Sequence, residues 1–124
     1  MNEENKSVAI FDDDEDILSI CQYVLHDQGW SVNTFASCDD VVNKLKACRP
    51  QVIFMDNWIP PNGGIIATRE IKNDIDLRDI PVIYFSANSE ISKLANTAGA
   101  EHFLAKPFDL DHLTEAIQAV LKSK

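Results

Sequence analysis

Five polar side chains stand at the ends of short apolar segments in this sequence. Asp12 and Asp13 follow one such segment, Asp56 ends a second, Ser86 ends a third, and Lys106 follows a fourth. Taken singly, each residue is typical of a helix cap, a turn or a solvated surface. Taken together, carboxylates, a hydroxyl and an ammonium group are the side chains that bind a cation and a phosphate, provided that the fold brings them to one place.

The carboxylates of Asp12, Asp13 and Asp56 predict a cation site. Two carboxylates about 5 Å apart repel each other by about 3 kcal/mol at an effective dielectric of roughly 20. Three such groups therefore need a positive partner. Oxygen ligands in a crevice open to water suit Mg²⁺ or Mn²⁺. No His or Cys stands at these segment ends, which argues against zinc.

A divalent cation beside Asp56, with Lys106 opposite, is suited to a phosphoryl group. The metal and the ammonium group spread the negative charge of the group in transfer. A carboxylate oxygen of Asp56 is then available to attack the phosphorus. The sequence therefore favours phosphoryl chemistry at Asp56.

Asp56 belongs to the stretch 51–64, around which the rest of the chain is arranged. Residues 52–55 are four consecutive apolar residues, typical of a strand buried on both faces of a parallel sheet. Residues 60–64 contain two prolines and two glycines, which predict a loop that cannot be helical. Asp56 is thus expected at the C-terminal end of a buried strand, where open α/β sheets bind ligands.

Apolar runs and helical stripes alternate along the whole chain. The expected strands span residues 7–11, 30–35, 52–56, 82–86 and 101–105. The expected helices have their apolar residues within 17–25, 41–45, 66–71, 89–98 and 110–121. Ser37 or Asp39 is expected to cap the second helix.

This alternation predicts an α/β fold, a doubly wound five-stranded parallel sheet with helices on both faces. By analogy with known doubly wound domains, the strand order is expected to be the flavodoxin-like 2-1-3-4-5. The C-terminal ends of the first, third, fourth and fifth strands then meet at one edge of the sheet. That edge is where the five polar side chains are expected to converge.

Length and charge narrow the function further. With 124 residues, the chain (1–124) is expected to form one domain with a real core. A net charge of −9 disfavours direct binding to nucleic acid or to an anionic membrane surface. No apolar run is long enough to cross a membrane, and residues 1–6 do not resemble a signal peptide. Cys21, Cys38 and Cys48 are expected to be reduced thiols in a cytoplasmic protein.

Four motifs follow one another along the chain. They are Ile10-Phe11-Asp12-Asp13, Phe54-Met55-Asp56 with Ile59-Pro60 and Gly64 behind it, Pro81-Val82-Ile83-Tyr84-Phe85-Ser86-Ala87, and Lys106-Pro107-Phe108. These motifs resemble those of the receiver domain of the bacterial two-component response-regulator family. Each motif is weak alone, but their order and spacing cover residues 8–121, nearly the whole chain.

The resemblance implies a phosphate-accepting signalling domain. Asp56 would accept a phosphoryl group from a phosphohistidine on a sensor histidine kinase or a histidine phosphotransfer protein. Mg²⁺ would be bound directly by Asp13, by Asp56 and by the backbone carbonyl of Trp58, while Asp12 would hold it through a water molecule. Such a domain is not an enzyme, because it promotes only its own phosphorylation and dephosphorylation.

The resemblance also implies a switch. Ser86 and Lys106 would contact phosphoryl oxygens, and Phe103 occupies the family's aromatic switch position, without the hydroxyl of the more common Tyr. Phosphorylation would draw Ser86 inward, and Phe103 would follow, which reshapes the face formed by residues 89–121 for a protein target or an output domain. A free-standing receiver and one joined to an output domain both fit. The Lys106–Pro107 peptide is expected to be cis.

Two other classes of protein share part of this pattern. A haloacid-dehalogenase-type enzyme also uses an Asp nucleophile with Mg²⁺, but it needs a second Asp two residues later, where this chain has Trp58. A flavodoxin-type flavin module needs a phosphate-binding loop rich in Ser, Thr and Gly after the first strand. Residues 12–16 are all acidic instead, and they repel phosphate unless a metal intervenes.

Overall fold

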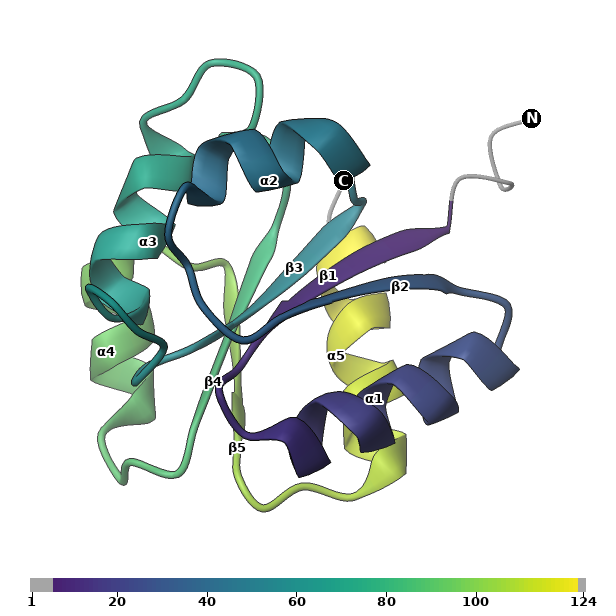
Figure 1. Ribbon diagram of the computed structural model, residues 1–124. Helices are drawn as coiled ribbons and strands as arrows, with labels where there is room; N and C mark the ends of the chain where they lie inside the picture. Colours follow the sequence, from purple (N-terminus) through teal and green to yellow (C-terminus); the bar gives the residue numbers. More distant parts are fainter. Residues whose placement is uncertain (1–5, 123–124) are drawn as a thin grey trace.

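The computed structural model describes residues 6–122. Five strands alternate with five helices (Figure 1). The strands are β1 (Ser7–Phe11), β2 (Ser31–Phe35), β3 (Val52–Asp56), β4 (Val82–Ser86) and β5 (His102–Ala105). The helices are α1 (Glu15–Asp27), α2 (Val41–Cys48), α3 (Gly64–Lys72), α4 (Ile91–Ala98) and α5 (Leu110–Lys122).

The strands form one sheet in the order β2-β1-β3-β4-β5, and every neighbouring pair is parallel. The predicted fold class and strand order are therefore confirmed. Phe54 of β3 pairs with Ile10 of β1 on one side and with Ile83 of β4 on the other. This register places β3 at the centre and aligns the C-terminal ends of the strands along one edge.

Each face of the sheet packs against its own apolar cluster. Helices α1 and α5 cover one face, while α2, α3 and α4 cover the other (Figure 1). Phe54 belongs to the cluster with α1 and α5, whereas its neighbour Met55 belongs to the opposite cluster. Full burial of an apolar side chain of this kind stabilises the fold by about 1.5–3 kcal/mol. The central strands are thus anchored on both faces, and their ends are held in fixed positions.

The structure corrects the predicted cap of α2. Neither Ser37 nor Asp39 caps this helix, because the residue before Val41 is Asp40, which has a left-handed backbone and makes no side-chain cap bond. The Asp39 carboxylate instead accepts hydrogen bonds from the Ser37 hydroxyl and from the Lys44 ammonium group. The local ion pair with Lys44 therefore outcompetes the cap.

Several other boundaries differ by one or two residues. Strand β2 begins after Trp30, β5 begins after Glu101, and α4 begins at Ile91 rather than at residue 89. Glu101 has a different role, since its carboxylate accepts the Val82 backbone N–H at 2.8 Å and so ties β5 to the start of β4.

Three further expectations concern the backbone, the cysteines and the membrane. The Lys106–Pro107 peptide is cis, as predicted, and the Pro60–Pro61 peptide is cis as well. The three cysteines are unpaired. Among residues 6–122, no helix is long and apolar enough to cross a membrane. Residues 1–6 were not expected to be a signal peptide. Residues 1–5 lie outside the part of the chain that the structure describes.

Candidate functional site

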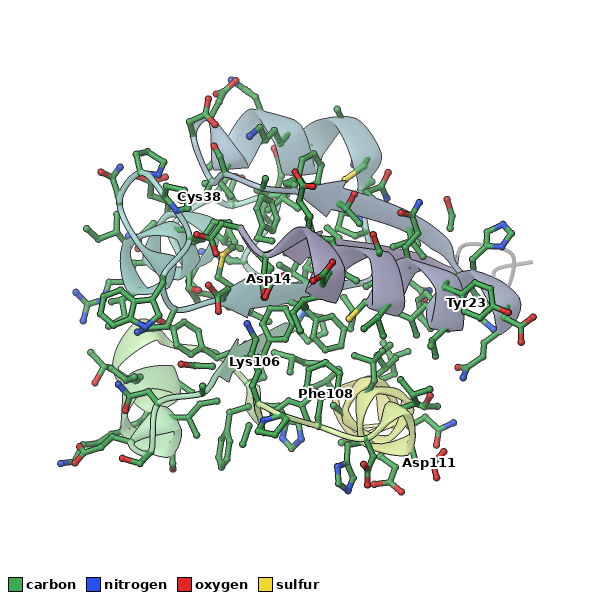
Figure 2. The ribbon with its side chains drawn as sticks, turned by 60° about the horizontal axis from the view of Figure 1, so that its bottom comes forward. Asp14, Tyr23, Cys38, Lys106, Phe108 and Asp111 are labelled. Carbon is green, nitrogen blue, oxygen red and sulfur yellow. The ribbon has the colours of Figure 1, made fainter. Side chains whose placement is uncertain are left out.

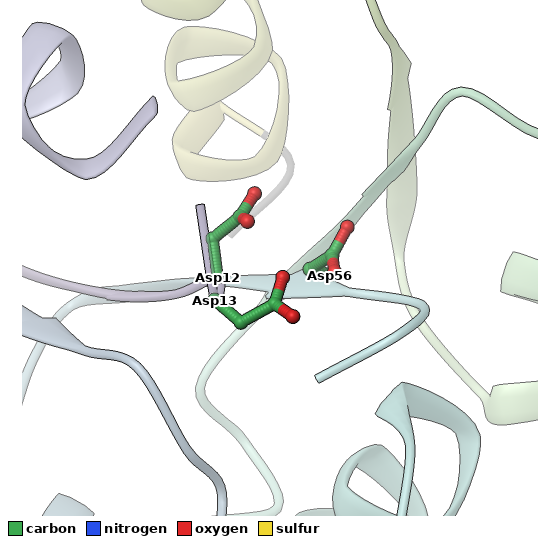
Figure 3. Close-up of side chains that lie close together, drawn as sticks. All are labelled: Asp12, Asp13 and Asp56. Carbon is green, nitrogen blue, oxygen red and sulfur yellow. The ribbon is translucent and has the colours of Figure 1, made fainter. Parts of the chain in front are cut away.

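The predicted acidic residues converge at the C-terminal edge of the sheet. Asp12 and Asp13 follow β1, and Asp56 is the last residue of β3. One carboxylate oxygen from each lies within 4.8 Å of the others (Figure 3). Asp12 and Asp56 are buried, with 1% and 4% of their surface exposed, whereas Asp13 is exposed. The cluster thus has two sheltered carboxylates and one that opens to solvent.

Lys106 reaches into this cluster from the end of β5. Its Nζ lies 2.5 Å from Oδ2 of Asp12 and 2.9 Å from Oδ1 of Asp56. The ammonium group also lies 4.6 Å from the centre of the Phe85 ring, which packs beside its path. Figure 2 labels Lys106 and also Asp14, the residue that precedes α1. Four residues predicted from three strand ends are therefore close to one another, and Lys106 directly contacts two of the three carboxylates.

Each buried carboxylate is oriented by its neighbouring loop. Oδ1 of Asp12 accepts the Asp14 backbone N–H at 2.9 Å, and Oδ2 of Asp56 accepts the Trp58 backbone N–H at 3.2 Å. Asp14 itself caps α1, since its Oδ1 accepts the Asp16 backbone N–H at 2.9 Å. The acidic run 12–16 is thus divided between a helix cap and the site.

The charges of the site do not balance. Burial raises the pKa of Asp56, and the nearby negative charge of Asp12 adds to this, while Lys106 opposes it. Burial alone would lower the pKa of Lys106, but hydrogen bonds to Asp12 and Asp56 outweigh that effect, so its pKa is raised. Lys106 is therefore held charged, and one ammonium group faces two buried carboxylates and the exposed Asp13.

This imbalance fits a bound dication. The donor atoms are all oxygens, they come from three side chains within 4.8 Å, and one of those side chains is open to solvent. Such a set matches Mg²⁺ or Mn²⁺, which keep several waters, and it does not match the nitrogen and sulfur ligands of zinc.

The remaining predicted site residues lie around this centre. Ser86 is the last residue of β4, with 1% of its surface exposed, and its Oγ accepts the Asn88 backbone N–H at 3.1 Å. Trp58 has a side chain that is 73% exposed, and its backbone N–H contacts the Asp56 carboxylate. Phe103, on the edge strand β5, is 40% exposed and stacks on His102 rather than on the site.

Gly64 is a site-shaping residue whose role the sequence did not reveal. It was expected in a loop that excludes helix, yet it is the first residue of α3. A Cβ at this position would lie 2.3 Å from the backbone oxygen of Asp56. The start of α3 therefore presses against the end of β3, and only a residue without a side chain fits. The Gly63-Gly64 pair behind Asp56 was the available signal.

The doubly wound sheet and its acidic edge agree with the comparison with known protein families. Residues 8–118 match the family described as the response regulator receiver domain. The chain belongs to this family, whose members have a phosphoacceptor role in two-component signalling.

Individual relatives agree with this assignment. The nitrogen assimilation regulatory protein NtrX of Azorhizobium caulinodans is 30% identical, over 94% of this chain and 26% of that protein. The phosphate regulon transcriptional regulatory protein PhoB of Escherichia coli is 27% identical, over 94% of this chain and 52% of that protein. The chain thus spans about half or less of these relatives' length.

A solved structure is similar over almost its full length. The receiver domain of a sensor histidine kinase from Pseudomonas aeruginosa has a TM-score of 0.84 and 26% identity, with 93% of this chain and 96% of that chain covered. That structure holds a magnesium ion coordinated in its active site cleft.

Proposed function

We propose that this chain is a signalling receiver that takes a phosphoryl group onto Asp56 in a Mg²⁺-dependent reaction. The observation that carries the proposal is the position of Asp56. It ends the central strand, its carboxylate lies 2.9 Å from the Lys106 ammonium group, and two further carboxylates lie within 4.8 Å. Asp12 shares the burial, the contact with Lys106 and the cluster, but it follows β1, whereas Asp56 is the last residue of the central strand β3.

In the proposed reaction, an Asp56 oxygen attacks the phosphorus of a phosphohistidine. The new O–P bond forms as the P–N bond breaks, and the imidazole leaves. Lys106 stabilises the negative charge on the phosphoryl oxygens, and the buried Ser86 hydroxyl lies at the neighbouring strand end as a further hydrogen-bonding group. A bound Mg²⁺ supplies additional positive charge at the transferring group. Attack by water on the same phosphorus breaks its bond to the Asp56 oxygen, releases inorganic phosphate and restores the carboxylate. In this proposal the domain promotes only its own phosphorylation and dephosphorylation.

We assign the metal ligands by similarity to the family. Asp13, Asp56 and the backbone carbonyl of Trp58 would bind the ion directly, and Asp12 would act through a water molecule. The exposed position of Asp13 supports a direct ligand that leaves water positions open. The indirect role of Asp12 rests on the resemblance to the family, because Lys106 contacts both Asp12 and Asp56. The magnesium ion in the Pseudomonas receiver supports the choice of metal.

The phosphate donor would be a sensor histidine kinase or a histidine phosphotransfer protein. The signal would leave through the α4-β5-α5 face, toward an attached output domain or a separate protein target. Ser86 would move toward the phosphoryl group, and Phe103 would turn inward behind it. The exposed ring of Phe103 and its position on β5 support this switch. The name of the PhoB relative, a transcriptional regulatory protein, supports an attached output domain.

The test uses a small acyl or amido phosphate donor with Mg²⁺. The intact mass is expected to rise by about 80 Da, the mass of one phosphoryl group. The Asp56→Asn variant should keep its original mass. Asp109→Asn is a matched control, because Asp109 lies beyond the site in the β5–α5 connection. Equal labelling of the Asp56→Asn variant would contradict the proposal.

A further inference from the structure

Tyr84 is an unusual residue for the centre of this sheet. It lies on β4 opposite Met55 of β3, it is fully buried, and it belongs to the apolar cluster beneath α3. A phenol hydroxyl in such a place needs a hydrogen-bond partner, because an unsatisfied buried donor is costly. Its partner is Oδ1 of Asn57, which accepts the Tyr84 hydroxyl proton. Asn57 is the residue that directly follows Asp56.

Asn57 is held a second time through its backbone. Its carbonyl oxygen accepts the Gly64 backbone N–H at 3.0 Å. The Tyr84 hydroxyl lies in the space beside the same glycine, 3.0 Å from where a Cβ on Gly64 would stand. Tyr84, Asn57 and Gly64 therefore form a clamp that connects β4, the loop after Asp56 and the start of α3.

The clamp holds the peptide between Asn57 and Trp58, which lies beside the carboxylate of Asp56. The residue after Asn57 is Trp58, whose backbone N–H contacts the Asp56 carboxylate and whose carbonyl is the assigned backbone ligand. Burial, together with the negative charge of Asp56, raises the pKa of Tyr84. The hydroxyl therefore keeps its proton at neutral and mildly alkaline pH, and it remains a donor to Asn57.

We propose that Tyr84 is a positioning residue for the metal site. Through its hydrogen bond to Asn57, it fixes the Asn57–Trp58 peptide in the orientation that the cation requires. It touches neither the metal nor the phosphoryl group. This inference rests on the proposed function, since it assigns the hydroxyl a role in binding the same Mg²⁺.

The test compares Tyr84→Phe, Asn57→Ala and the double variant by calorimetric titration with Mg²⁺. Each single variant should weaken Mg²⁺ binding about fivefold, which corresponds to about 1 kcal/mol. The double variant should be no weaker than either single one, because both remove the same interaction. Labelling by a small phosphate donor should slow at limiting Mg²⁺ and recover to within about twofold of wild type at saturating Mg²⁺.

Tyr23→Phe is the matched control, because Tyr23 is the only other tyrosine in the sequence. It is 78% exposed on α1, away from Lys106 (Figure 2), and its variant should bind Mg²⁺ like wild type. A merely structural role for Tyr84 would lower the melting temperature and leave the Mg²⁺ affinity of the folded protein unchanged. Asn57→Ala alters only the half-buried loop residue, so it tests the clamp even if Tyr84→Phe does not fold.

If wild type binds Mg²⁺ normally and either Tyr84→Phe or Asn57→Ala binds it with unchanged affinity, the role of Tyr84 is overturned. The proposed function would not be affected by that result. Additive losses in the double variant would overturn the role of Tyr84 too, because they would show two independent effects. A wild-type protein that binds no Mg²⁺ would overturn the proposed function as well.

Discussion

At the scale of single residues, Asp56 is under opposing influences. Burial and the neighbouring Asp12 disfavour its ionised form, yet the proposed reaction needs an ionised oxygen. Lys106 offsets this cost only in part, because it is shared between the two carboxylates. The protein without metal thus holds a carboxylate whose ionised form is only partly compensated, an arrangement common at functional sites.

Replacing Asp56 with Asn should therefore stabilise the fold, and the gain should depend on pH. The pKa of Asp56 is raised by folding, so ionising it costs stability as the pH rises through that raised pKa. Below the pKa of an unfolded aspartate, about 3.9, the carboxyl is protonated in both states and the cost vanishes.

In metal-free buffer, the free energy of unfolding of Asp56→Asn should exceed that of wild type by on the order of 1 kcal/mol at about pH 7.5. The difference should be much smaller at about pH 4.5. Urea unfolding at the two pH values measures this difference. A variant that is less stable than wild type at the higher pH would show that Lys106 overcompensates the carboxylate.

Trp58 offers a spectroscopic probe of the same site. Its backbone N–H contacts Asp56, so a dication bound there should change the local field and the emission of its indole. The change should saturate with Mg²⁺, persist in Trp30→Phe and vanish in Trp58→Phe. Asp13→Ala should weaken it strongly, since that variant removes a proposed ligand and leaves the indole in place. If the emission change with Mg²⁺ persists in Trp58→Phe and disappears in Trp30→Phe, the metal binds elsewhere.

The site residues differ in how far the sequence could reveal them. Asp12, Asp56 and Lys106 each end or follow an apolar strand, so strand position alone predicts that they meet. The bond between Tyr84 and Asn57 depends on the reach of one buried side chain under a loop. Sequence periodicity does not encode that reach, because Tyr84 is simply one more apolar position in β4.

At the scale of elements, the contact between β3 and α3 sets the geometry of the loop after Asp56. The Gly64 N–H bonds the Asn57 carbonyl at 3.0 Å, and the Gly63 N–H bonds the Ile59 carbonyl at 2.8 Å. Element types and order followed from periodicity, whereas element ends did not. Asp40, in a left-handed conformation before α2, and Gly64, inside the first turn of α3, depend on neighbouring segments that local propensity does not describe.

Gly64→Ala should therefore disturb both the fold and the site. The new Cβ would stand 2.3 Å from the Asp56 backbone oxygen, so α3 and the end of β3 must separate. The expected loss is about 2–3 kcal/mol in the free energy of unfolding, typical of overpacking in a well-packed region. Mg²⁺ affinity should fall as well, because Asp56 moves.

Gly99→Ala is the control for this variant. Gly99 also resists substitution, since its φ is +90°, but a Cβ there meets nothing closer than Lys72 Cγ at 3.8 Å. The Gly99→Ala substitution should lower the free energy of unfolding by about 1–2 kcal/mol and leave the Mg²⁺ affinity unchanged. Denaturant unfolding and calorimetry separate the two effects. Wild-type Mg²⁺ affinity in a folded Gly64→Ala protein would contradict the proposed coupling between α3 and Asp56.

At the scale of the whole molecule, the architecture places a concentrated negative charge at one edge of a rigid sheet. The sequence carries a net charge of −9, and the two apolar clusters hold β1 and β3 so that Asp12 and Asp56 cannot move apart. Alternating βα units predicted this architecture, because parallel strands with helical crossovers allow few arrangements. The residual charge of the site follows only from the packed structure, since it depends on which carboxylates share Lys106.

Mg²⁺ should consequently stabilise the protein far more than monovalent salt does. A ligand that binds only the folded state, at a concentration a hundredfold above its dissociation constant, adds about 2.7 kcal/mol. NaCl at equal ionic strength only screens the net charge and should raise the melting temperature less. In Asp13→Ala, most of the rise in melting temperature with Mg²⁺ should be lost, and the rise with NaCl should remain. The variant should still fold, because Asp13 is exposed and contributes little to the core. Thermal unfolding of both proteins in the two salts measures this. Equal gains from both salts in wild type would show that the negative charge is screened as a whole rather than bound at the cluster.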